Sequence, residues 1–498
     1  MDQRDGLGKD TRSEETVTSR RPSVEGLCRA EAEQTARNPK SGPTDYPIST
    51  PTQSRQLPRR ASHPDTEEPG APGQEATAPG RPRQSWGPIE RVLRLRTFAA
   101  LRHREFRLLW FGQAATGMAM WMDQVARGWL MYELTNSTVQ LGLVQGVQVI
   151  PLLLLSPIAG SAADRYPRKQ QVMVSQVLAG LMYAVLALLI LTGSILPWHV
   201  YATAFGMAMV QVFHQPARAA MIADAVPPRD LTNAIGLNSV VFNVARSTGP
   251  ALAGFLIATL GTAICYSVQT VFYVLAVVWT MQLRPEPSAA SSGHAAHGVS
   301  FVQSIVEGWT FSWRNESVRA GLLIMMCASL FIGPFTTLLP VFARDLLGVG
   351  ATGQGGLLTA MGIGALCSAI FVASLGDQLP RGQLMLWGVT VYGLSVVAFA
   401  ASPSFRLSLG LMTIVGLAHV SSHALVQTVI QTYSPAAFRG RTMAIFHMSS
   451  VVWTLGSLLV GTLAALVGAR WAAAAMGAMG ALFMVMIAVA LPGARRIR

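Results

Sequence analysis

Long apolar runs separated by short polar segments fill the sequence from about residue 106 to residue 491. Each run is roughly 20 residues long, which is the length that an α-helix needs to cross about 30 Å of hydrocarbon. The pattern therefore predicts an all-α membrane protein with about twelve transmembrane helices. The expected spans are Phe106–Tyr132, Gln140–Ala163, Gln170–Gly193, His199–Ala223, Leu231–Leu260, Ala263–Leu283, Arg319–Leu346, Gly353–Ser374, Gln383–Ala401, Arg406–Gln431, Thr442–Val467 and Trp471–Leu491.

Arginine and lysine gather in every second loop between these runs. They lie around Arg104, Arg168, Arg229, Arg381 and Arg441, whereas the intervening loops carry at most a single arginine. Because basic loops remain on the cytoplasmic side of a membrane, this alternation predicts that both termini are cytoplasmic. We expect a multi-pass protein of the bacterial cytoplasmic membrane.

The longest internal polar stretch, residues 284–317, divides the spans into two sets of about six. Equal sets indicate a duplicated architecture, with a substrate path between the two halves near the middle of the membrane. We therefore expect two pseudo-symmetric six-helix bundles at residues 100–283 and 318–491, joined by a cytoplasmic loop at 284–317. A basic cytoplasmic C-terminus is expected at 492–498.

Residues 1–88 differ in composition from the rest of the chain. They are rich in Pro, Gly, Ser, Thr, Gln and mixed charge, with few aromatic or β-branched residues. Such a segment cannot bury enough apolar surface to offset its chain entropy, so we expect a disordered cytoplasmic tail. It also lacks the apolar region and small-residue cleavage site of a secretory signal.

The charge of the chain is spread along the sequence rather than clustered. Charged residues make up 13% and hydrophobic residues 51% of the chain, whereas about 25% of a typical soluble domain is charged. The net charge of +13 lies along the tail and the expected cytoplasmic loops, where it faces anionic lipid headgroups. We therefore expect the lipid bilayer as a partner, and no nucleic acid.

The sequence shows no recognisable motif for ATP hydrolysis or for metal binding. The lysines are Lys9, Lys40 and Lys169, and none of them stands in a Gly-x-x-x-x-Gly-Lys-Ser/Thr loop. The four cysteines are scattered without metal-ligand spacing. We expect no cofactor and no metal, and neither an enzyme nor a transporter driven by its own ATP hydrolysis.

The loop after the second expected span contains a Gly-x-x-x-Asp-Arg-x-x-Arg-Lys sequence. It resembles the signature of the major facilitator superfamily between its second and third helices, with Pro167 where many members have glycine. In that family the aspartate approaches the N-terminus of the eleventh helix, where free N–H groups favour an anion, and an arginine pairs with an acid at the end of helix four. The resemblance implies that Asp164 faces the helix beginning near residues 440–443 and that Arg168 reaches Asp224. The implied cytoplasmic gate comprises Gly160, Asp164, Arg165, Arg168, Lys169 and Asp224.

The fifth expected span contains Gly249 and Pro250, followed by Gly254. This cluster looks like the Gly-Pro motif of the exporters in the same superfamily. Small residues let helices approach closely, and proline removes a backbone hydrogen bond. The resemblance therefore implies a bending element that seals or opens the cavity.

Three further segments narrow the resemblance. Residues 214–234, 338–345 and 439–443 are similar to the branch of the superfamily that exports drugs, macrolides and siderophores, of the transmembrane secretion effector type. The resemblance covers residues 106–491 and leaves the N-terminal tail unexplained.

Three charged residues within the expected spans are candidates for the cavity, because intramembrane charges usually face one. Arg246, near the middle of the fifth span, either binds a polar or acidic substrate, holds a gate, or is a structural cation. Asp123 and Arg127 are four residues apart and share a helix face. Asp123 is the carboxylate best suited to proton coupling, while Arg127 beside it favours a static ion pair.

Histidines form the second group of candidates for proton coupling. His419 and His423 share a face of the tenth span, and His214 lies deep in the fourth. Histidine exchanges protons near neutral pH, so protonation coupled to export is one interpretation, and packed histidines are the other.

These observations predict a secondary active transporter that exports a hydrophobic or amphipathic small molecule by alternating access and proton antiport, acting as a monomer. The excess of Arg and His over acids in the spans favours a neutral or anionic substrate. Alternatives are a facilitator that imports a small metabolite, a transport-inactive sensor or scaffold acting through the tail, and a membrane-embedded enzyme built on His419, His423 and His447.

Overall fold

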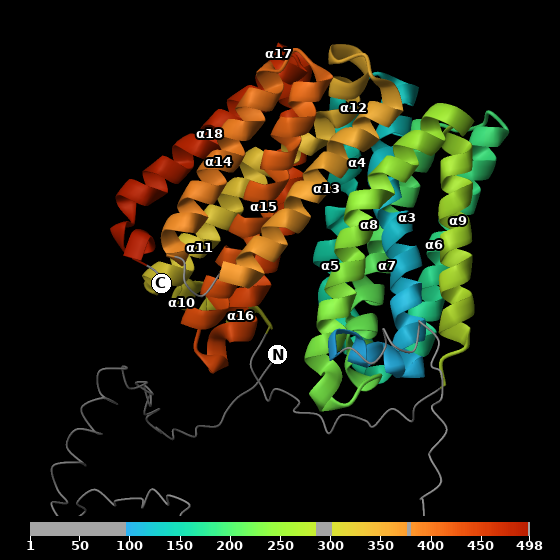
Figure 1. Ribbon diagram of the computed structural model, residues 1–498, viewed down its shortest axis with the longest axis horizontal. Helices are drawn as coiled ribbons and strands as arrows, with labels where there is room; N and C mark the ends of the chain where they lie inside the picture. Colours follow the sequence, from blue (N-terminus) through green and yellow to red (C-terminus); the bar gives the residue numbers. More distant parts are fainter. Residues whose placement is uncertain (1–95, 285–300, 376–379, 497–498) are drawn as a thin grey trace, which may run out of the picture. The chain divides into compact units, whose positions relative to one another are not determined.

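The computed structural model describes residues 96–284, 301–375 and 380–496, and within these ranges the chain is helical without β-strands (Figure 1). The expected tail at 1–88 lies outside the described residues. The first half of the chain contains η1 (Arg96–Arg102), α3 (Arg104–Thr135), α4 (Thr138–Val147), α5 (Val149–Arg165), α6 (Arg168–Leu191), α7 (Pro197–Asp224), η2 (Pro228–Asp230), α8 (Leu231–Leu260) and α9 (Thr262–Met281). The second half contains α10 (Phe301–Arg314), α11 (Glu316–Cys327), η3 (Ala328–Ile332), η4 (Gly333–Leu338), α12 (Leu339–Val341), η5 (Phe342–Leu346), α13 (Gly350–Leu375), α14 (Arg381–Ala401), α15 (Phe405–Tyr433), α16 (Ala436–His447), α17 (Ser449–Val467), α18 (Ala469–Ala490) and η6 (Pro492–Arg496).

Ten helical segments within the described ranges are long and apolar enough to cross a membrane. The expected spans at Phe106–Tyr132 and His199–Ala223 are helical as well, as α3 and α7, but they are not among the ten. Both helices carry several polar side chains in their central turns, which lowers their hydropathy. The same polar side chains line the cavities described below.

Large apolar side chains cover the outer faces of the helices. Leu154, Leu188, Trp387, Leu466 and Trp471 are between 60% and 78% exposed. Soluble proteins rarely expose contiguous apolar surface on this scale, whereas lipid chains solvate it. The exposure therefore agrees with the membrane location that the apolar runs predict.

Single glycines make the connections from α8 to α9 and from α17 to α18. Gly261 has φ 89° and ψ 165°, and Gly468 has φ 88° and ψ 154°. Side chains are strongly disfavoured in this backbone region, so glycine is required at both positions. The two connections occupy matching places in the two halves of the sequence, between the fifth and sixth and between the eleventh and twelfth expected spans.

Three expected spans are interrupted rather than continuous. The second is broken at Gln148, between α4 and α5, and the eleventh at Met448, between α16 and α17. The span expected at Arg319–Leu346 passes through two π-helical segments, η3 and η5, with the 3₁₀ segment η4 between them. Pro334 and Pro340 lie in this stretch and donate no backbone hydrogen bond, which accounts for the irregular winding.

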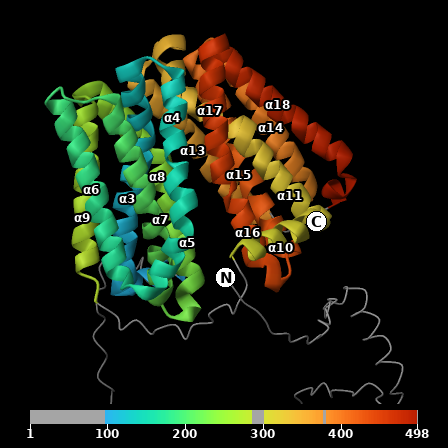
Figure 2. The same ribbon diagram turned by 180° about the vertical axis from the view of Figure 1, so that it is seen from behind.

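The two most extensive helix packings between the first and second halves of the described chain are those of α4 on α17 and of α8 on α13 (Figures 1 and 2). Both crossings bring glycines against the opposite backbone. A Cβ at Gly142 would lie 2.6 Å from the Ser457 carbonyl oxygen, and a Cβ at Gly254 would lie 2.6 Å from that of Ala351. Glycine allows this close approach of the helices.

The expected loop at 284–317 contains a helix in its second part. Helix α10 occupies Phe301–Arg314 and packs against α16 (Figure 2). Trp309 and Trp313 stack on each other on the exposed face, with ring centroids 5.6 Å apart, while Glu307 forms an ion pair with Arg441. Residues 301–314 of the expected loop are therefore helical, with apolar side chains that recur with the helical period, and the role of the segment as a cytoplasmic connection between the two sets of spans stays a prediction.

Candidate functional site

Two adjoining cavities lie between the first and second halves of the chain. The larger, of about 650 Å³, is bordered by α3, α5, α7 and α17, and the smaller, of about 290 Å³, by α3, α4, η4 and α13. Residues that line both are Met120, Asp123, Arg127, Gln145 and Gln148. Because these residues border both spaces, we call the two spaces together the central cavity. Asp123, Arg127, Gln145 and Gln148 form its polar centre.

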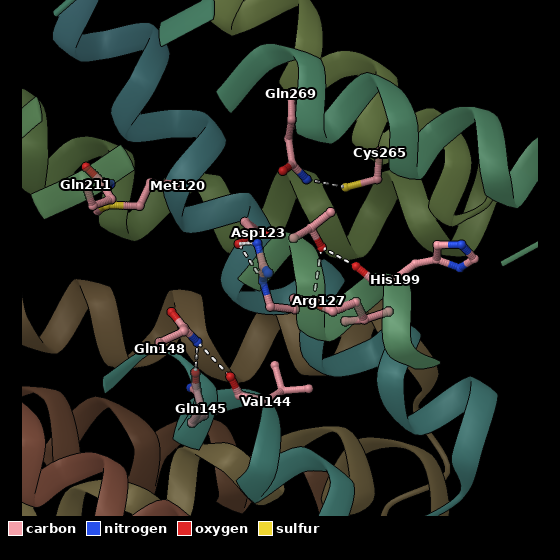
Figure 3. A network of polar contacts seen from close by, with 12 residues as sticks. Met120, Asp123, Arg127, Val144, Gln145, Gln148, His199, Gln211, Cys265 and Gln269 are labelled. Atoms are coloured by element: carbon pink, nitrogen blue, oxygen red, sulfur yellow. Dashed lines mark hydrogen bonds and ion pairs between the residues drawn. The ribbon is translucent and has the colours of Figure 1, made fainter. Parts of the chain in front are cut away.

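The ion pair of the central cavity is formed by Asp123 and Arg127 on α3 (Figure 3). The Arg127 Nε and Nη2 atoms donate to one carboxylate oxygen, Oδ2 of Asp123, at 2.9 and 2.7 Å. Their side chains are 7% and 15% exposed. The Tyr183 hydroxyl also donates to the Asp123 carboxylate. Oδ1 of Asp123 and Nη1 of Arg127 are buried without a closer partner among the described residues.

Glutamines surround this ion pair. Gln148, at the break between α4 and α5, donates to the Val144 carbonyl oxygen at 3.1 Å and to Gln145 Oε1 at 2.7 Å (Figure 3). Gln211 of α7 and Gln354 of α13 also border the cavity. Amide groups donate and accept without carrying charge, so these residues offer neutral hydrogen bonds around a single ion pair.

Apolar side chains form the other wall of the larger space. Met120, Leu152, Met207 and Trp453 line it. Methionine adapts its shape readily, and tryptophan presents a broad apolar face. A polar centre beside an apolar wall is suited to an amphipathic molecule.

The candidate Arg246 lies where α8 meets the second half of the chain. Its guanidinium stacks over the Trp121 ring, 5.4 Å from the centroid, and its Nη2 lies 3.4 Å from His419 Nδ1 on α15. Arg246 does not line the central cavity, but Trp121 does. The structure thus places Arg246 behind the cavity wall.

The candidate histidines fall into two separate places. His419 and His423 have ring centroids 6.3 Å apart and line a small cavity of about 20 Å³ beside Trp453. His214 is buried on α7, beside Arg218, and borders another small cavity that shares Met120 with the central one. Within the described ranges, no group of three or more His, Cys, Asp and Glu side chains is placed to hold a metal ion.

Gly249 and Gly254 lie where α8 contacts two different helices. A Cβ at Gly249 would lie 2.8 Å from Trp121 Cβ on α3, whereas Gly254 faces α13. Helix α8 runs without interruption through Pro250. The contacts show close packing at these positions, and a bending role remains a prediction.

Three hydrogen bonds lie beyond the central cavity, near the C-terminus of α3. Tyr132 donates to Asp345 of η5, and Arg344 Nη1 donates to Asn136 Oδ1 at 3.0 Å. Thr138 donates to the Gly461 carbonyl oxygen at 2.8 Å. All three join the first half of the chain to the second, and we call them the polar seal.

We expect the substitution Tyr132→Phe to weaken the polar seal. It removes the hydroxyl that binds Asp345, a loss of about 1 kcal/mol, which shifts the equilibrium toward conformations open at this end by about fivefold. Spin labels placed across this end of the chain measure the shift as a change in the distance distribution.

Tyr201→Phe is the matched control. The Tyr201 hydroxyl bonds Gln140 within the first half of the chain, so its loss removes a tyrosine hydrogen bond without touching a contact between the halves. An equal shift in both variants contradicts the assignment of Tyr132 to the polar seal.

The opposite end carries the residues of the expected gate. Arg168 Nη1 donates to Asp224 Oδ2 at 2.5 Å, so the contact implied by the signature is present. Lys169 Nζ donates to the carbonyl oxygens of Met281 and Leu283, at 2.8 and 2.5 Å, and thereby caps α9. The side chains of Asp164 and Arg165 lie outside the described part of the structure, and Gly160 lies within α5.

Sequence reasoning missed the glutamines of the central cavity and the residues of the polar seal. A signal for the glutamines was present, because Gln145 and Gln148, and likewise Gln211 and Gln215, are spaced three or four residues apart within apolar runs. Asp345 gave no such signal, because it lies at the edge of its apolar run, where loop residues are expected.

Comparisons with known proteins agree with this architecture. The sequence profile of the family described as transmembrane secretion effector matches residues 95–496. The multidrug efflux pump Tap of Mycolicibacterium fortuitum is 27% identical over 398 residues, covering 78% of this chain and 96% of that protein. The staphyloferrin A transporter of Staphylococcus aureus is 22% identical over 355 residues, covering 70% and 86%.

A solved structure shares the fold. It is the crystal structure of a bacterial homologue of the human lysosomal transporter Spinster, in an inward-facing and unoccupied conformation. The TM-score is 0.62 at 14% identity, with 79% of this chain and 96% of that chain covered. At this identity the likeness concerns the fold alone.

Proposed function

The chain belongs to the transmembrane secretion effector family of major facilitator transporters, and from that membership we propose that it exports a hydrophobic or amphipathic small molecule by alternating access. The central cavity is the observation that carries the proposal. It lies between the two halves of the chain and combines an ion pair and glutamines with an apolar wall. The similarity to a multidrug efflux pump and to a staphyloferrin A transporter supports the transport of small molecules.

The proposed architecture is two six-helix bundles, residues 100–283 and 318–491, that rock about the central cavity. The crossings of α4 with α17 and of α8 with α13 support it, because glycines leave few interlocking side chains between the halves. The protein acts as a monomer in the bacterial cytoplasmic membrane, with both termini in the cytoplasm. In this orientation the polar seal lies toward the outside of the cell and the expected gate toward the cytoplasm.

Export is coupled to proton entry in this proposal, with Asp123, His214, His419 and His423 as candidate proton carriers. We expect inverted membrane vesicles that contain the protein to accumulate an amphipathic fluorescent dye only while a pH gradient, acid inside, is present. Collapse of the gradient with nigericin is expected to lower the uptake to the level of vesicles without the protein. Uptake that is indifferent to the gradient contradicts proton antiport and leaves export itself in place.

The cytoplasmic gate consists of Gly160, Asp164, Arg165, Arg168, Lys169 and Asp224, as the family signature implies. Asp164 faces α16 near residues 440–443 in the closed gate, and Arg168 holds Asp224 at the end of α7. The pair of Arg168 and Asp224 supports this assignment. Gly249 and Pro250, with Gly254, form the bending element of α8.

We expect Arg168→Gln to lower transport several-fold while changing the free energy of unfolding by less than about 1 kcal/mol. The Asp224 side chain is 47% exposed, and exposed ion pairs contribute little to stability, so a large loss of transport must come from the gate. Initial rates in inverted vesicles and the thermal unfolding midpoint measure the two effects.

Arg229→Gln is the control for charge alone. Arg229 is a basic residue of the same end of the chain, with a side chain that is 83% exposed. If both variants transport equally well, Arg168 acts only in membrane topology and the gate assignment is wrong.

A further inference from the structure

The central cavity contains unpartnered donors and acceptors in equal number. The acceptors are the second carboxylate oxygen of Asp123 and Gln354 Oε1, and the donors are Arg127 Nη1 and Trp121 Nε1. All four residues line the smaller space of the cavity. Buried polar groups are normally paired in folded proteins. The four atoms are closed off from the cavity space in this conformation, so a ligand completes their pairing when these side chains turn toward it.

The net charge of these four side chains is zero. Asp123 and Arg127 contribute one negative and one positive charge, and Gln354 and Trp121 contribute none. A ligand that carries only a cation meets attraction from Asp123 and repulsion from Arg127, and an anion meets the reverse. A ligand with both charges gains from each group, because its ammonium donates to the acceptors and its carboxylate oxygens accept from the donors.

The four residues come from both halves of the chain. Asp123 and Arg127 fix each other through two hydrogen bonds on α3, whereas Gln354 belongs to α13, in the other half of the chain. Gln354 is 1% exposed. A head group bound between them therefore contacts both halves of the chain.

We propose that the central cavity selects amphipathic molecules with a zwitterionic head group, whose ammonium binds at Asp123 and Gln354 and whose carboxylate binds at Arg127 and Trp121. The apolar body of the molecule lies in the larger space, against Met207 and Trp453. This inference rests on the proposed function, since it names the substrate class of the same cavity.

The test uses the full chain in lipid nanodiscs and three dansyl probes with the same fluorophore. Nε-dansyl-lysine carries an ammonium and a carboxylate, dansylcadaverine lacks the carboxylate, and dansyl-aminohexanoate lacks the ammonium. We expect the zwitterion to bind about tenfold more tightly than either singly charged probe, as measured by fluorescence titration. Equal binding of the three probes, tighter binding of a singly charged one, or binding of none overturns the inference.

Two kinds of variant separate the roles of the residues. Arg127→Gln is expected to equalise the zwitterion and the cation, and Asp123→Asn to equalise the zwitterion and the anion. The double variant D123N/R127Q leaves no unpaired buried charge and therefore keeps the fold. In it the three affinities are expected to agree within about threefold, and a retained preference for the zwitterion contradicts the assignment.

Uptake into inverted vesicles distinguishes a failure of the inference from a failure of the proposed function. Selective binding of Nε-dansyl-lysine without uptake of any probe supports the head-group site and contradicts export. Uptake of the uncharged dye Nile red by vesicles whose protein shows no preference among the dansyl probes supports export and contradicts the head-group site.

Discussion

Asp123→Asn is expected to destabilise the protein by about 3–5 kcal/mol and to abolish export. The substitution leaves the Arg127 guanidinium charged and buried, with an amide in place of its ion-pair partner, and removing one partner of a buried pair has a cost of this size. Thermal unfolding in nanodiscs and dye uptake in vesicles measure the two losses.

The double variant D123N/R127Q provides the control for this prediction. Because it removes both charges together, we expect it to recover most of the lost stability without recovering export. A double variant that is no more stable than Asp123→Asn shows that the pair is not energetically coupled. A double variant that exports normally shows that the pair has no role in transport.

Gly254→Val is expected to lower export by at least about tenfold. A Cβ at this position would lie 2.6 Å from the Ala351 carbonyl oxygen and 3.0 Å from Gly355 Cα, so the substitution forces α8 away from α13. Overpacking of this kind typically destabilises by about 1–3 kcal/mol, and here it disturbs one of the two most extensive packings between the halves of the chain. Export rates and the unfolding midpoint provide the measurement.

Gly236→Val on the same helix is the matched control. A Cβ at Gly236 meets no atom within 4 Å, so the variant adds the same side chain to α8 without touching α13. If the two variants export equally, the close crossing at Gly254 is not required for the transport cycle.

Hydropathy placed most of the long helices of the described residues, because a membrane span needs a continuous apolar run and the polar segments between the runs end it. Helices α3 and α7 are not among the ten apolar spans. The boundaries of α6 and α14 lie within two residues of the expected ones. The breaks at Gln148 and Met448 could not be predicted, because neither residue is a proline or a glycine, the residues that usually interrupt a helix. Helix α10 was missed because it follows a long polar stretch and is too short to span a membrane.

The candidate site was also predicted only in part, because some of its contacts follow from local spacing and others depend on tertiary packing. The spacing of Asp123 and Arg127 predicts their ion pair, since residues four apart meet on a helix. Their position in a cavity depends on α4, α7 and α13, which pack around α3 only in the folded chain. Tyr132 and Asp345 are 213 residues apart in the sequence, and no local pattern connects them.

Residues 328–346 combine π-helical, α-helical and 3₁₀ segments, so the rise per residue varies along this span. A 3₁₀ turn rises about 2.0 Å per residue and an α turn about 1.5 Å, so exchanging one hydrogen-bond pattern for another lengthens or shortens the span and rotates its side chains without unwinding it. Thr337, beside the central cavity, and Asp345, in the polar seal, lie on this stretch. We therefore expect a change of winding at Thr337 to displace Asp345 and weaken the polar seal.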